Sequence, residues 1–271
     1  MPEFLIDSLE DSRLDPYRDL KSPASRARET FVAEGEKLVL RLLDSTCRTD
    51  SILCTRAALD RLRDRIPADI PVFIAGTPVI SALIGFQFHR GILACGRRPA
   101  ERSLSELCAA LAQANRCLLV LCPEIRDPAN LGTIIRTAAA FGASGVVAGR
   151  AGTDPFSRRV LRTSMGSVLK MPIVQTDDWQ GALATLHRSG FESIATVLDP
   201  DAAPVQTSPG PPRAAIFLGN EDEGLPADLV AGCQRCVTLP MAAGVDSLNV
   251  AVAAGIVLSH FANLPPRLDS L

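Results

Sequence analysis

The sequence predicts an α/β protein of two domains, the second of which is built on a parallel β-sheet. Three observations support this fold class: short continuous apolar runs recur along the second half of the chain, stretches of helical spacing separate them, and a charged segment without periodicity divides the chain near residue 100. Alternating strands and helices are typical of a parallel sheet with crossover helices. A chain of 271 residues is long enough for both domains.

Residues 1–100 are predicted to form a small α/β domain. Helical spacing of the apolar residues predicts a helix over 28–44, and short β-prone runs predict strands at 51–54, 72–75 and 91–95. Residues 97–103 are charged, contain a proline and have no periodicity, so we expect a linker there. The second domain then covers residues 101–271.

The second domain alternates helices with strands from its first residues. A helix is expected at 105–114, and continuous apolar runs predict buried strands at 117–122, 145–148, 171–174, 194–198, 215–218 and 236–239. The stretches between and after these strands have helical spacing, at 131–141, 157–168, 178–189, 226–233 and 248–262. Residues 199–213 hold five prolines, which predict an extended loop and a candidate cover for a site.

The composition excludes several classes of protein. The first residues lack a basic opening and an apolar run, and the apolar stretch 248–258 is too short to span a bilayer, so we expect a cytoplasmic protein that does not interact with membranes. The eight cysteines are scattered through apolar segments, which predicts reduced core thiols rather than a disulfide framework. Cys233 and Cys236 have the spacing of half a zinc site, but no second such pair exists in the sequence, so no bound metal is expected.

The charge balance restricts how the protein could hold nucleic acid. A formal net charge of −2 argues against binding by bulk electrostatics, so any RNA contact must be local. Arg150, Arg158, Arg159 and Arg162 are a candidate local cluster, since arginines bind phosphates as bidentate donors. A solvated helix face is the alternative interpretation.

Three polar, glycine-containing segments follow predicted strands: 130–136, 219–224 and 239–250. Ligands of open α/β sheets bind outside the carboxyl ends of the strands, so these segments are expected to converge on one pocket. Asn130 is placed as the N-cap of its helix. Capping does not explain Gly132, which costs about 1 kcal/mol relative to alanine, or Arg136 four residues later. Together they would let a bulky partner approach beside a guanidinium.

The other two segments favour a neutral or cationic ligand. Residues 219–224 have a glycine at each end and three carboxylates between, a poor cradle for phosphate but compatible with a sulfonium cofactor. Ser247 is the expected N-cap of a helix that begins at Leu248 and is apolar nearly all round, so this helix should be buried. Asn249 would then be a buried amide that requires partners, supplied by a ligand or by the core.

Other chemistries find less support in the sequence. It has no dinucleotide fingerprint after the first strand of the second domain, no P-loop and no nucleophile elbow. His89, His187 and His260 are widely spaced and far from the candidate segments, so each is interpreted as a structural or surface histidine.

The order and wording of the three segments resemble the three motifs of the SpoU/TrmH family of RNA 2'-O-ribose methyltransferases. Residues 154–166 and 31–35 also resemble that family, so nearly the whole chain is involved. The resemblance implies an N-terminal RNA-binding domain, a C-terminal S-adenosyl-L-methionine domain folded as a deep trefoil knot, and a homodimer. Three motifs in the right order make coincidence improbable.

The resemblance also implies roles for individual residues. The residues around the reacting centre would be Asn130, Arg136, Glu221, Ser247 and Asn249. The cofactor would be held, largely by main-chain groups, at Leu218, Gly219, Asn220, Gly224, Leu239, Met241, Ser247 and Leu248. Arg158, Arg159 and Arg162 would contact RNA. The family proposal makes Arg136 the base, yet a guanidinium stays protonated, so Arg136 could instead clamp the adjacent phosphate.

The leading hypothesis is therefore 2'-O-methylation of ribosomal RNA, because this two-domain layout is common in the family's ribosomal enzymes. Transfer RNA is the alternative substrate. A non-catalytic RNA-binding or cofactor-sensing protein of the same fold is a second hypothesis, against which the intact Asn130, Arg136, Ser247 and Asn249 argue. A small-molecule α/β enzyme with chance matches is a third, and failure to bind S-adenosyl-L-methionine would favour it.

Overall fold

The computed structural model describes residues 1–18, 20, 29–220, 222–245 and 247–262, and it divides into two compact units. Unit 1 consists of Met1–Ala100 and Phe156–Lys170, and unit 2 consists of Glu101–Pro155 and Met171–Leu271. The division after Ala100 falls within the predicted linker. Residues 156–170, which the sequence placed in the second domain, pack with the N-terminal part of the chain instead.

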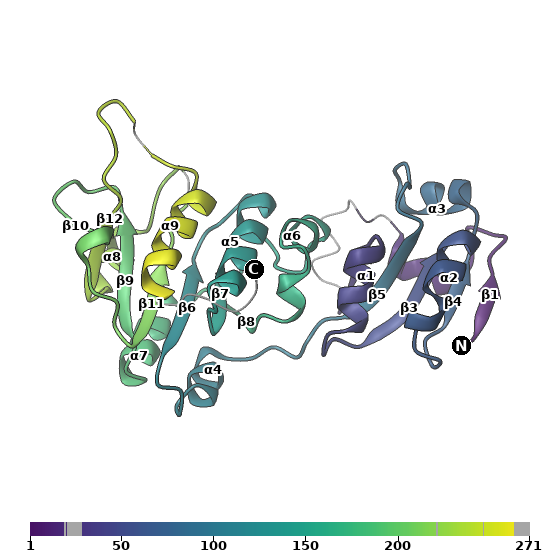
Figure 1. Ribbon diagram of the computed structural model, residues 1–271, viewed down its shortest axis with the longest axis horizontal. Coiled ribbons are helices and arrows are strands. Elements are labelled where there is room, and N and C mark those ends of the chain that lie inside the picture. Colours follow the sequence, from purple (N-terminus) through teal and green to yellow (C-terminus); the bar gives the residue numbers. More distant parts are fainter. Residues whose placement is uncertain (19, 21–28, 221, 246, 263–271) are drawn as a thin grey trace, which may run out of the picture. The chain divides into compact units, whose positions relative to one another are not determined.

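Unit 1 is a five-stranded mixed sheet with helices (Figure 1). Its strands, in spatial order, are β1 (Glu3–Leu5), β4 (Val72–Ile74), β3 (Thr49–Cys54), β5 (Ile92–Arg97) and β2 (Thr30–Glu34). β1, β4 and β3 run parallel, whereas β5 is antiparallel to both of its neighbours. The α-helices are α1 (Glu36–Leu43), α2 (Arg56–Leu62), α3 (Thr77–Ile84) and α6 (Arg158–Thr163), and the short 3₁₀ helices are η1 (Ser12–Tyr17), η3 (Arg63–Arg65) and η4 (Ser167–Leu169).

The helix predicted over residues 28–44 is wrong in its first part. Residues 30–34 form β2, and only Glu36–Leu43 form α1. Four consecutive residues of β2, Phe31 to Glu34, are buried, which a strand enclosed on both faces allows but an amphipathic helix does not. Gly35 separates the two elements with a φ of 91°, in the left-handed region that favours glycine.

Unit 2 is a seven-stranded, fully parallel sheet, and the six strands predicted there are confirmed. In spatial order the strands are β10 (Ala203–Pro204), β12 (Arg235–Thr238), β9 (Glu192–Val197), β11 (Arg213–Phe217), β6 (Cys117–Cys122), β7 (Gly145–Gly149) and β8 (Ile173–Thr176). Strand β11 lies between β6 and β9, which both precede it in the chain. The chain therefore returns to the middle of the sheet before it adds β12 outside β9.

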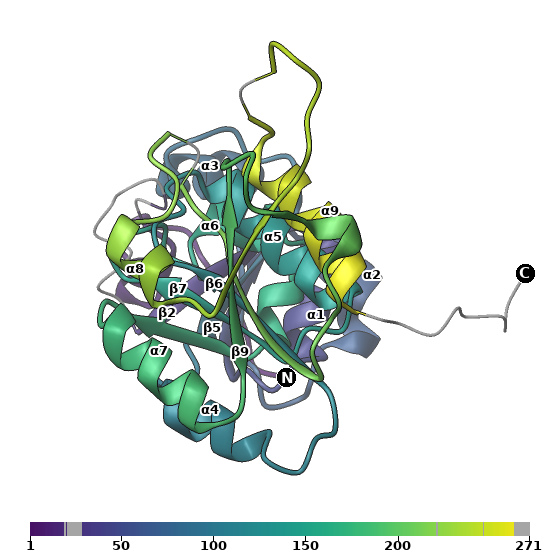
Figure 2. The same ribbon diagram turned by 90° about the vertical axis from the view of Figure 1, so that its left-hand side faces the viewer.

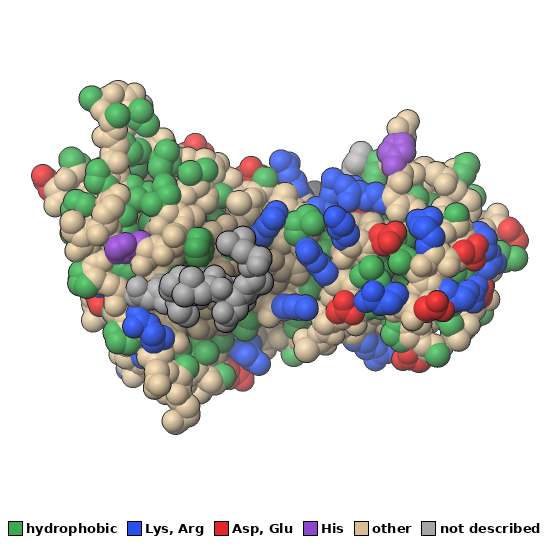
Figure 3. Space-filling model, in the orientation of Figure 1, with side chains coloured by type: hydrophobic (Ala, Val, Ile, Leu, Met, Phe, Trp, Pro, Cys, Tyr) green, Lys and Arg blue, Asp and Glu red, His purple; other side chains and the backbone are tan. Residues whose placement is uncertain are grey.

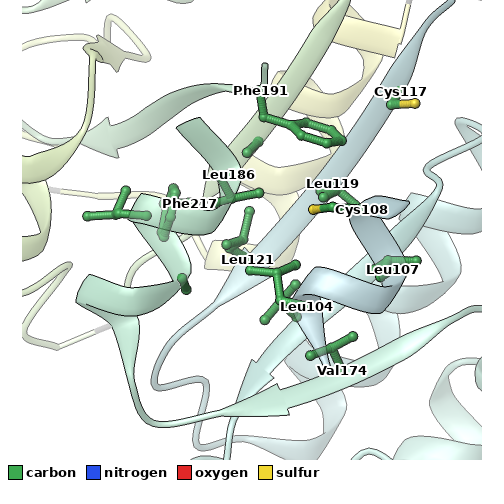
Figure 4. Packing of buried hydrophobic residues seen from close by; sticks show 14 of the residues in the cluster. Leu104, Leu107, Cys108, Cys117, Leu119, Leu121, Val174, Leu186, Phe191 and Phe217 are labelled. Atoms are coloured by element: carbon green, nitrogen blue, oxygen red, sulfur yellow. The ribbon is translucent and has the colours of Figure 1, made fainter. Parts of the chain in front are cut away.

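Helices cover both faces of this sheet (Figures 1 and 2). One face carries α5 (Pro128–Ala140) and α9 (Val250–Ala262), which pack on each other, and the other carries α4 (Leu104–Ala110), α7 (Trp179–Arg188) and α8 (Ala227–Gly232). The second face buries one apolar cluster, in which Phe217 of β11 and Leu186 of α7 are fully enclosed (Figure 4). Truncating such a side chain to alanine typically costs about 2–5 kcal/mol, so the cluster holds the strand ends in fixed positions.

The proline-rich segment 199–213 is not only an extended loop. Residues Ala203–Pro204 form β10 against β12, and a short 3₁₀ helix, η5 (Val205–Thr207), follows with Val205 only 1% exposed. The imidazole Nε2 of His260, on α9, lies 2.7 Å from the carbonyl oxygen of Ser208. The segment is thus fixed to the edge of the sheet.

Several global features bear on function. None of the helices formed by the described residues is long and apolar enough to cross a membrane. All eight cysteines are free, and five of them are buried. Within the ranges that the structure describes, no group of three or more His, Cys, Asp or Glu side chains is arranged to hold a metal ion.

Candidate active site

The three polar segments start from the carboxyl ends of strands in the parallel sheet. Phe217, the last residue of β11, is in register with Leu121 of β6 and with Ala195 of β9, and Thr238 at the end of β12 is in register with Val197 of β9. The loops that follow β6, β11 and β12 therefore lie together at the carboxyl ends of the strands, where ligands of parallel α/β sheets bind.

The first segment is helix α5, which begins earlier than predicted. Asp127, not Asn130, is its N-cap, since the Asp127 carboxylate accepts a hydrogen bond of 2.9 Å from the Ala129 amide. Pro128 occupies the first helical position, where its missing N–H costs nothing. Asn130 lies inside the first turn, so its side chain is left for another contact. Its Oδ1 accepts a hydrogen bond of 3.0 Å from Nδ2 of Asn249.

Gly132 and Arg136 occupy different environments on α5. Gly132 is buried and Arg136 is exposed. Among the residues that the structure describes, the Arg136 guanidinium has no hydrogen-bond or ion-pair partner. A permanently charged fork of five N–H donors is therefore available to a ligand such as phosphate.

Asn220 organises the second segment. Its side chain is 6% exposed, donates from Nδ2 to the Glu124 carbonyl over 2.9 Å, and accepts at Oδ1 from the Asp222 amide over 2.8 Å. Its backbone exchanges two hydrogen bonds of 3.0 Å with Gly224. The side chain of Asn220 is thus directed to the protein and fixes the shape of the loop, which leaves the predicted cofactor contact to the main chain. Glu221 lies outside the described residues.

The two glycines of this loop are required for different reasons. A Cβ added to Gly219 would lie 2.6 Å from the Gly224 carbonyl carbon and 2.8 Å from the Leu225 nitrogen, so the close approach of two backbone segments excludes a side chain. Gly224 has a φ of 71° but open space around it, so only its conformation favours glycine. Arg126, which follows β6, bridges the carboxylates of Glu124 and Glu223 at 3.1 and 3.3 Å and so connects this loop to the loop after β6.

The third segment departs from the prediction at its helix. Helix α9 begins at Val250 rather than Leu248, and its cap is Asn249 rather than Ser247, because Oδ1 of Asn249 accepts from the Ala251 amide at 3.0 Å. Asn249 is exposed, not buried. Its carbonyl-type oxygen caps the helix while its Nδ2 reaches Asn130, so one amide uses both of its functional atoms.

The main chain on either side of this turn has unused hydrogen-bonding capacity. With the other described residues, no backbone hydrogen bond involves Leu239, Met241, Ser247 or Leu248. Their N–H and C=O groups are therefore open to water or to a ligand. This donor and acceptor set suits a neutral heterocycle and ribose better than a polyanion, because it carries no fixed positive charge.

The predicted run of four arginines is divided between the two units. Arg150, in unit 2, forms an ion pair of 2.7 Å with Glu101. In unit 1, Nε of Arg158 lies 2.7 Å from Oε2 of Glu34, and its guanidinium stacks 3.9 Å from the ring centre of Phe86. Arg159 and Arg162 are exposed on α6. Arg158 is therefore held within unit 1 by Glu34 and Phe86.

Fold and site together define an α/β protein with a ligand-binding edge on a parallel sheet, and comparison with known proteins identifies the family. The sequence model of the SpoU rRNA Methylase family matches residues 117–259, more than half of the 271-residue chain. An uncharacterized tRNA/rRNA methyltransferase of Mycobacterium tuberculosis is 34% identical over 256 residues, 91% of this chain and 87% of that protein. The chain belongs to the SpoU rRNA methylase family.

Two further relatives agree in length as well as in sequence. The 23S rRNA (guanosine(2553)-2'-O)-methyltransferase of Bacillus subtilis is 31% identical over 260 residues, covering 94% of this chain and 98% of that protein. The AdoMet-bound rRNA methyltransferase from Sinorhizobium meliloti has a similar structure, with a TM-score of 0.82, 27% identity, and coverage of 95% of this chain and 97% of that chain. The family predicted from three motifs is thus confirmed.

Sequence reasoning missed the true start of α5 and the structural role of Asn220. Asp127 and Pro128 form an N-cap and first-turn pair, a recognised helix-start signal that would have placed the beginning of α5 correctly. The role of Asn220 had no sequence signal, because its partner Glu124 is 96 positions away.

Proposed function

We propose that this protein is an S-adenosyl-L-methionine-dependent RNA methyltransferase that modifies a ribose 2'-hydroxyl, with ribosomal RNA as its substrate. The observation that carries the proposal is the meeting of the first and third motifs in the 3.0 Å contact between Asn130 and Asn249, at the sheet edge where the second motif is also fixed. The Bacillus relative, whose name specifies 2'-O-methylation of 23S rRNA, supports the ribosomal substrate over transfer RNA.

The loops fit the cofactor that this function requires. Main-chain groups of Leu239, Met241, Ser247 and Leu248 would hold the nucleoside, and the turn shaped by Gly219 and Asn220 would border it. The loop after β11 exposes Asp222 and Glu223, whose negative charge is compatible with a sulfonium and unfavourable to a polyphosphate. When bound, S-adenosyl-L-methionine supplies an electrophilic methyl group.

The residues of the chain would contribute mainly by positioning. The reaction joins the ribose 2'-oxygen to the methyl carbon, breaks the carbon–sulfur bond and releases the hydroxyl proton, leaving a neutral thioether. Alignment of the reacting atoms can supply a large part of such a rate enhancement. Asn130 and Asn249 would orient the ribose, and Arg136 would hold the adjacent phosphate. Because the guanidinium stays protonated, we propose that the proton leaves to a neighbouring group or water, with Ser247 at the reacting centre.

We also propose that unit 2 is folded as a trefoil knot. The supporting observation is the insertion of β11 between β6 and β9, followed by the return of α9 to pack on α5. Ordinary α/β sheets add strands at their edges and avoid threading, so this path is unusual. An experimental chain trace through residues 190–250 tests the proposal.

A homodimer is the proposed assembly. Helix α9 has an exposed apolar stripe, with Val252 and Ile256 53% and 42% exposed, one turn apart, and Leu248 precedes it at 37%. The prediction that this helix is buried all round is wrong for the isolated chain, and a second copy would cover the stripe. Replacing Val252 and Ile256 by aspartate should convert a dimer to a monomer in light scattering, whereas Val245→Asp at the exposed turn serves as a comparison. A wild-type monomer would contradict the assembly.

The function is tested by methyl transfer. Labelled S-adenosyl-L-methionine is incubated with the protein and with unmodified ribosomal or transfer RNA, and the RNA is then digested to nucleosides. The proposal predicts a 2'-O-methylated nucleoside from ribosomal RNA. Label on a base, label only in transfer RNA, or no transfer and no cofactor binding by calorimetry would each contradict a stated part of it.

A further inference from the structure

The loop after β7 takes no part in the proposed cofactor site, yet it packs against the loop that leads into α5. We name residues 150–154 the β7 loop and residues 123–127 the β6 loop; both belong to unit 2. A Cβ added to Gly149, the last residue of β7, would lie 1.8 Å from the carbonyl oxygen of Pro123. One added to Gly152 would lie 3.0 Å from the carbonyl oxygen of Ile125. The two backbones therefore lie in direct contact.

The β6 loop has three consecutive carbonyl groups that each accept a hydrogen bond from another loop. The Glu124 carbonyl accepts from Nδ2 of Asn220 at 2.9 Å. The Ile125 carbonyl accepts from the Thr153 amide at 2.9 Å, and the Arg126 carbonyl accepts from the Thr153 hydroxyl at 2.5 Å. One residue of the β7 loop thus satisfies two acceptors, next to the acceptor that the second motif satisfies.

Thr153 is enclosed where it makes these contacts. Its exposed fraction is 9%, and Ile125 beside it is 1% exposed. A carbonyl that loses a shielded donor carries the cost of its own desolvation. Removal of the Thr153 hydroxyl therefore forces the β6 loop either to move or to admit a water molecule.

The β6 loop determines where α5 begins. Asp127 ends the loop and caps α5, and Asn130 and Arg136 follow on that helix. Asn130 in turn contacts Asn249 over 3.0 Å. A displacement of the β6 loop therefore moves the start of α5, and with it the residues proposed to align the ribose and its phosphate.

The contacts of Thr153 are neutral hydrogen bonds and not ion pairs. On the face drawn in Figure 3, lysine and arginine side chains gather over α1 and α6 of unit 1, whereas the surface of unit 2 is mainly apolar or uncharged. Salt screens interactions between exposed charges, which neutral hydrogen bonds do not depend on. The contribution of Thr153 should therefore be independent of salt, unlike contacts with RNA phosphates.

We infer that Thr153 is a positioning residue for methyl transfer. Its amide and hydroxyl fix the β6 loop from one side while Asn220 fixes it from the other, and together they hold Asn130 where it aligns the ribose. The hydroxyl of Thr153 is directed to the protein, so it acts through Asn130 and not on the reacting atoms. This inference rests on the proposed function, because that function assigns Asn130 to the reacting centre.

The experiment compares two variants that each lose one hydroxyl. Thr153→Val removes the hydroxyl but retains the branched shape and the amide donor, and Thr153→Ser restores a hydroxyl. Thr185→Val is the matched control, since the Thr185 hydroxyl donates to the Gly181 carbonyl over 2.8 Å on α7, on the opposite face of the sheet from α5. Steady-state methyl transfer to in vitro-transcribed 23S rRNA is measured for the full chain at about 50 and 200 mM salt. Calorimetry gives the affinity for S-adenosyl-L-methionine, and thermal melting verifies folding.

Thr153→Val should lower kcat about tenfold at both salt concentrations, because small errors of alignment are costly in rate. It should change KM and cofactor affinity by less than about twofold. Thr153→Ser and Thr185→Val should stay within about twofold of wild type in all three quantities. A lowered melting temperature with an unchanged kcat of the folded Thr153→Val enzyme would show a purely structural role and overturn the inference.

A second substitution tests whether Thr153 acts through Asn130. In an Asn130→Ala background, Thr153→Val should lower kcat by less than about twofold more, because residues that act as a unit are not additive. A further loss of about tenfold would show independent roles and contradict the inference.

Hydrogen exchange of the free protein tests the positioning without methyl transfer. The amide of Leu131, bonded to the Asp127 carbonyl, and the amides that follow it in α5 should exchange about five- to tenfold faster in Thr153→Val, as expected for the loss of one hydrogen bond. Thr185→Val should leave them unchanged. Equal protection in wild type and Thr153→Val would overturn the inference even in an active enzyme. No methyl transfer by wild type, with the exchange difference present, would overturn the proposed function while the role of Thr153 in positioning α5 would stand.

Discussion

The loops at the carboxyl ends of the unit 2 strands differ from the basic pocket of unit 1 in what their polar side chains contact. This α1/α6 pocket is lined by the end of β2, by α1 and by α6. In the loops, the side chains of Asn220 and Asn249 form hydrogen bonds within the protein, to Glu124 and Asn130. Several main-chain groups of the same loops have no backbone partner among the described residues. In the pocket, Glu34 pairs with Arg158 and Arg90, whereas Lys37 and Arg162 have no hydrogen-bond or ion-pair partner among the described residues. One region is organised for shape and the other for charge.

This difference predicts a division of labour, in which the loops of unit 2 determine the chemical step and the pocket of unit 1 determines RNA affinity. A site defined by fixed backbone should tolerate few substitutions and should determine the chemical step, since alignment errors of about 1 Å can cost 100-fold in rate. A site defined by exposed charge should tolerate single substitutions and should determine RNA affinity in a salt-dependent manner. Arg136 is the exception, because it is an exposed charge located on the first motif.

The largest expected effect is at Arg136. Arg136→Ala should lower methyl transfer at saturating RNA by about 100-fold, because a phosphate that is no longer held lets the 2'-hydroxyl move out of alignment with the methyl group. Cofactor affinity should not change. Arg116→Ala, an exposed arginine at the opposite end of strand β6, is the matched control and should behave as wild type. Near-full activity of Arg136→Lys would contradict a bidentate role for the guanidinium.

The next largest effect separates the two glycines of the second motif. In Gly219→Ala the added Cβ would lie 2.6 Å from the Gly224 carbonyl carbon, so the two backbone segments must move apart. Cofactor binding should weaken at least about tenfold, equivalent to about 1.4 kcal/mol. Gly224→Ala meets no atom within 4 Å and should cost only the conformational penalty of about 1–2 kcal/mol. Calorimetry with S-adenosyl-L-methionine and thermal melting distinguish them. Equal loss of cofactor affinity in both variants would contradict the close-approach argument.

Asn249 allows its two roles to be separated. Asn249→Ala removes the cap of α9 and should cost about 1 kcal/mol, a decrease in Tm of about 2–4 °C. Asn249→Ser retains a capping oxygen and should preserve the Tm, while it loses the contact with Asn130 and about tenfold in methyl transfer. If serine restored both quantities, the amide contact would have no part in the reaction.

The smallest effect is expected at Lys37. Lys37→Ala should weaken RNA binding only about two- to fivefold and make the salt slope shallower by about 1, because one phosphate contact is lost among several. The rate at saturating RNA should not change. A large fall in that rate would place Lys37 in the chemical step and remove the distinction between the two regions.

The sequence predicted the parallel sheet and the converging segments because those signals are local. Buried parallel strands are continuous apolar runs, and the three motifs are contiguous in sequence. The missed features depend on distant partners. The Phe31 to Glu34 run is a strand because β5 pairs with it, and Arg158 belongs with unit 1 because Glu34 and Phe86 hold it. The stripe on α9 is exposed because helices of unit 2 cover only one side of it.

The most direct measurement is a steady-state titration of 23S rRNA in the methyl-transfer assay, with wild type, Arg136→Ala and the Arg159→Ala, Arg162→Ala double variant side by side. The division of labour predicts that Arg136→Ala lowers kcat, whereas the double variant raises KM about 10- to 100-fold and reaches the wild-type kcat at low salt. A double variant with lowered kcat and unchanged KM, or an Arg136→Ala enzyme with normal kcat, would contradict the account.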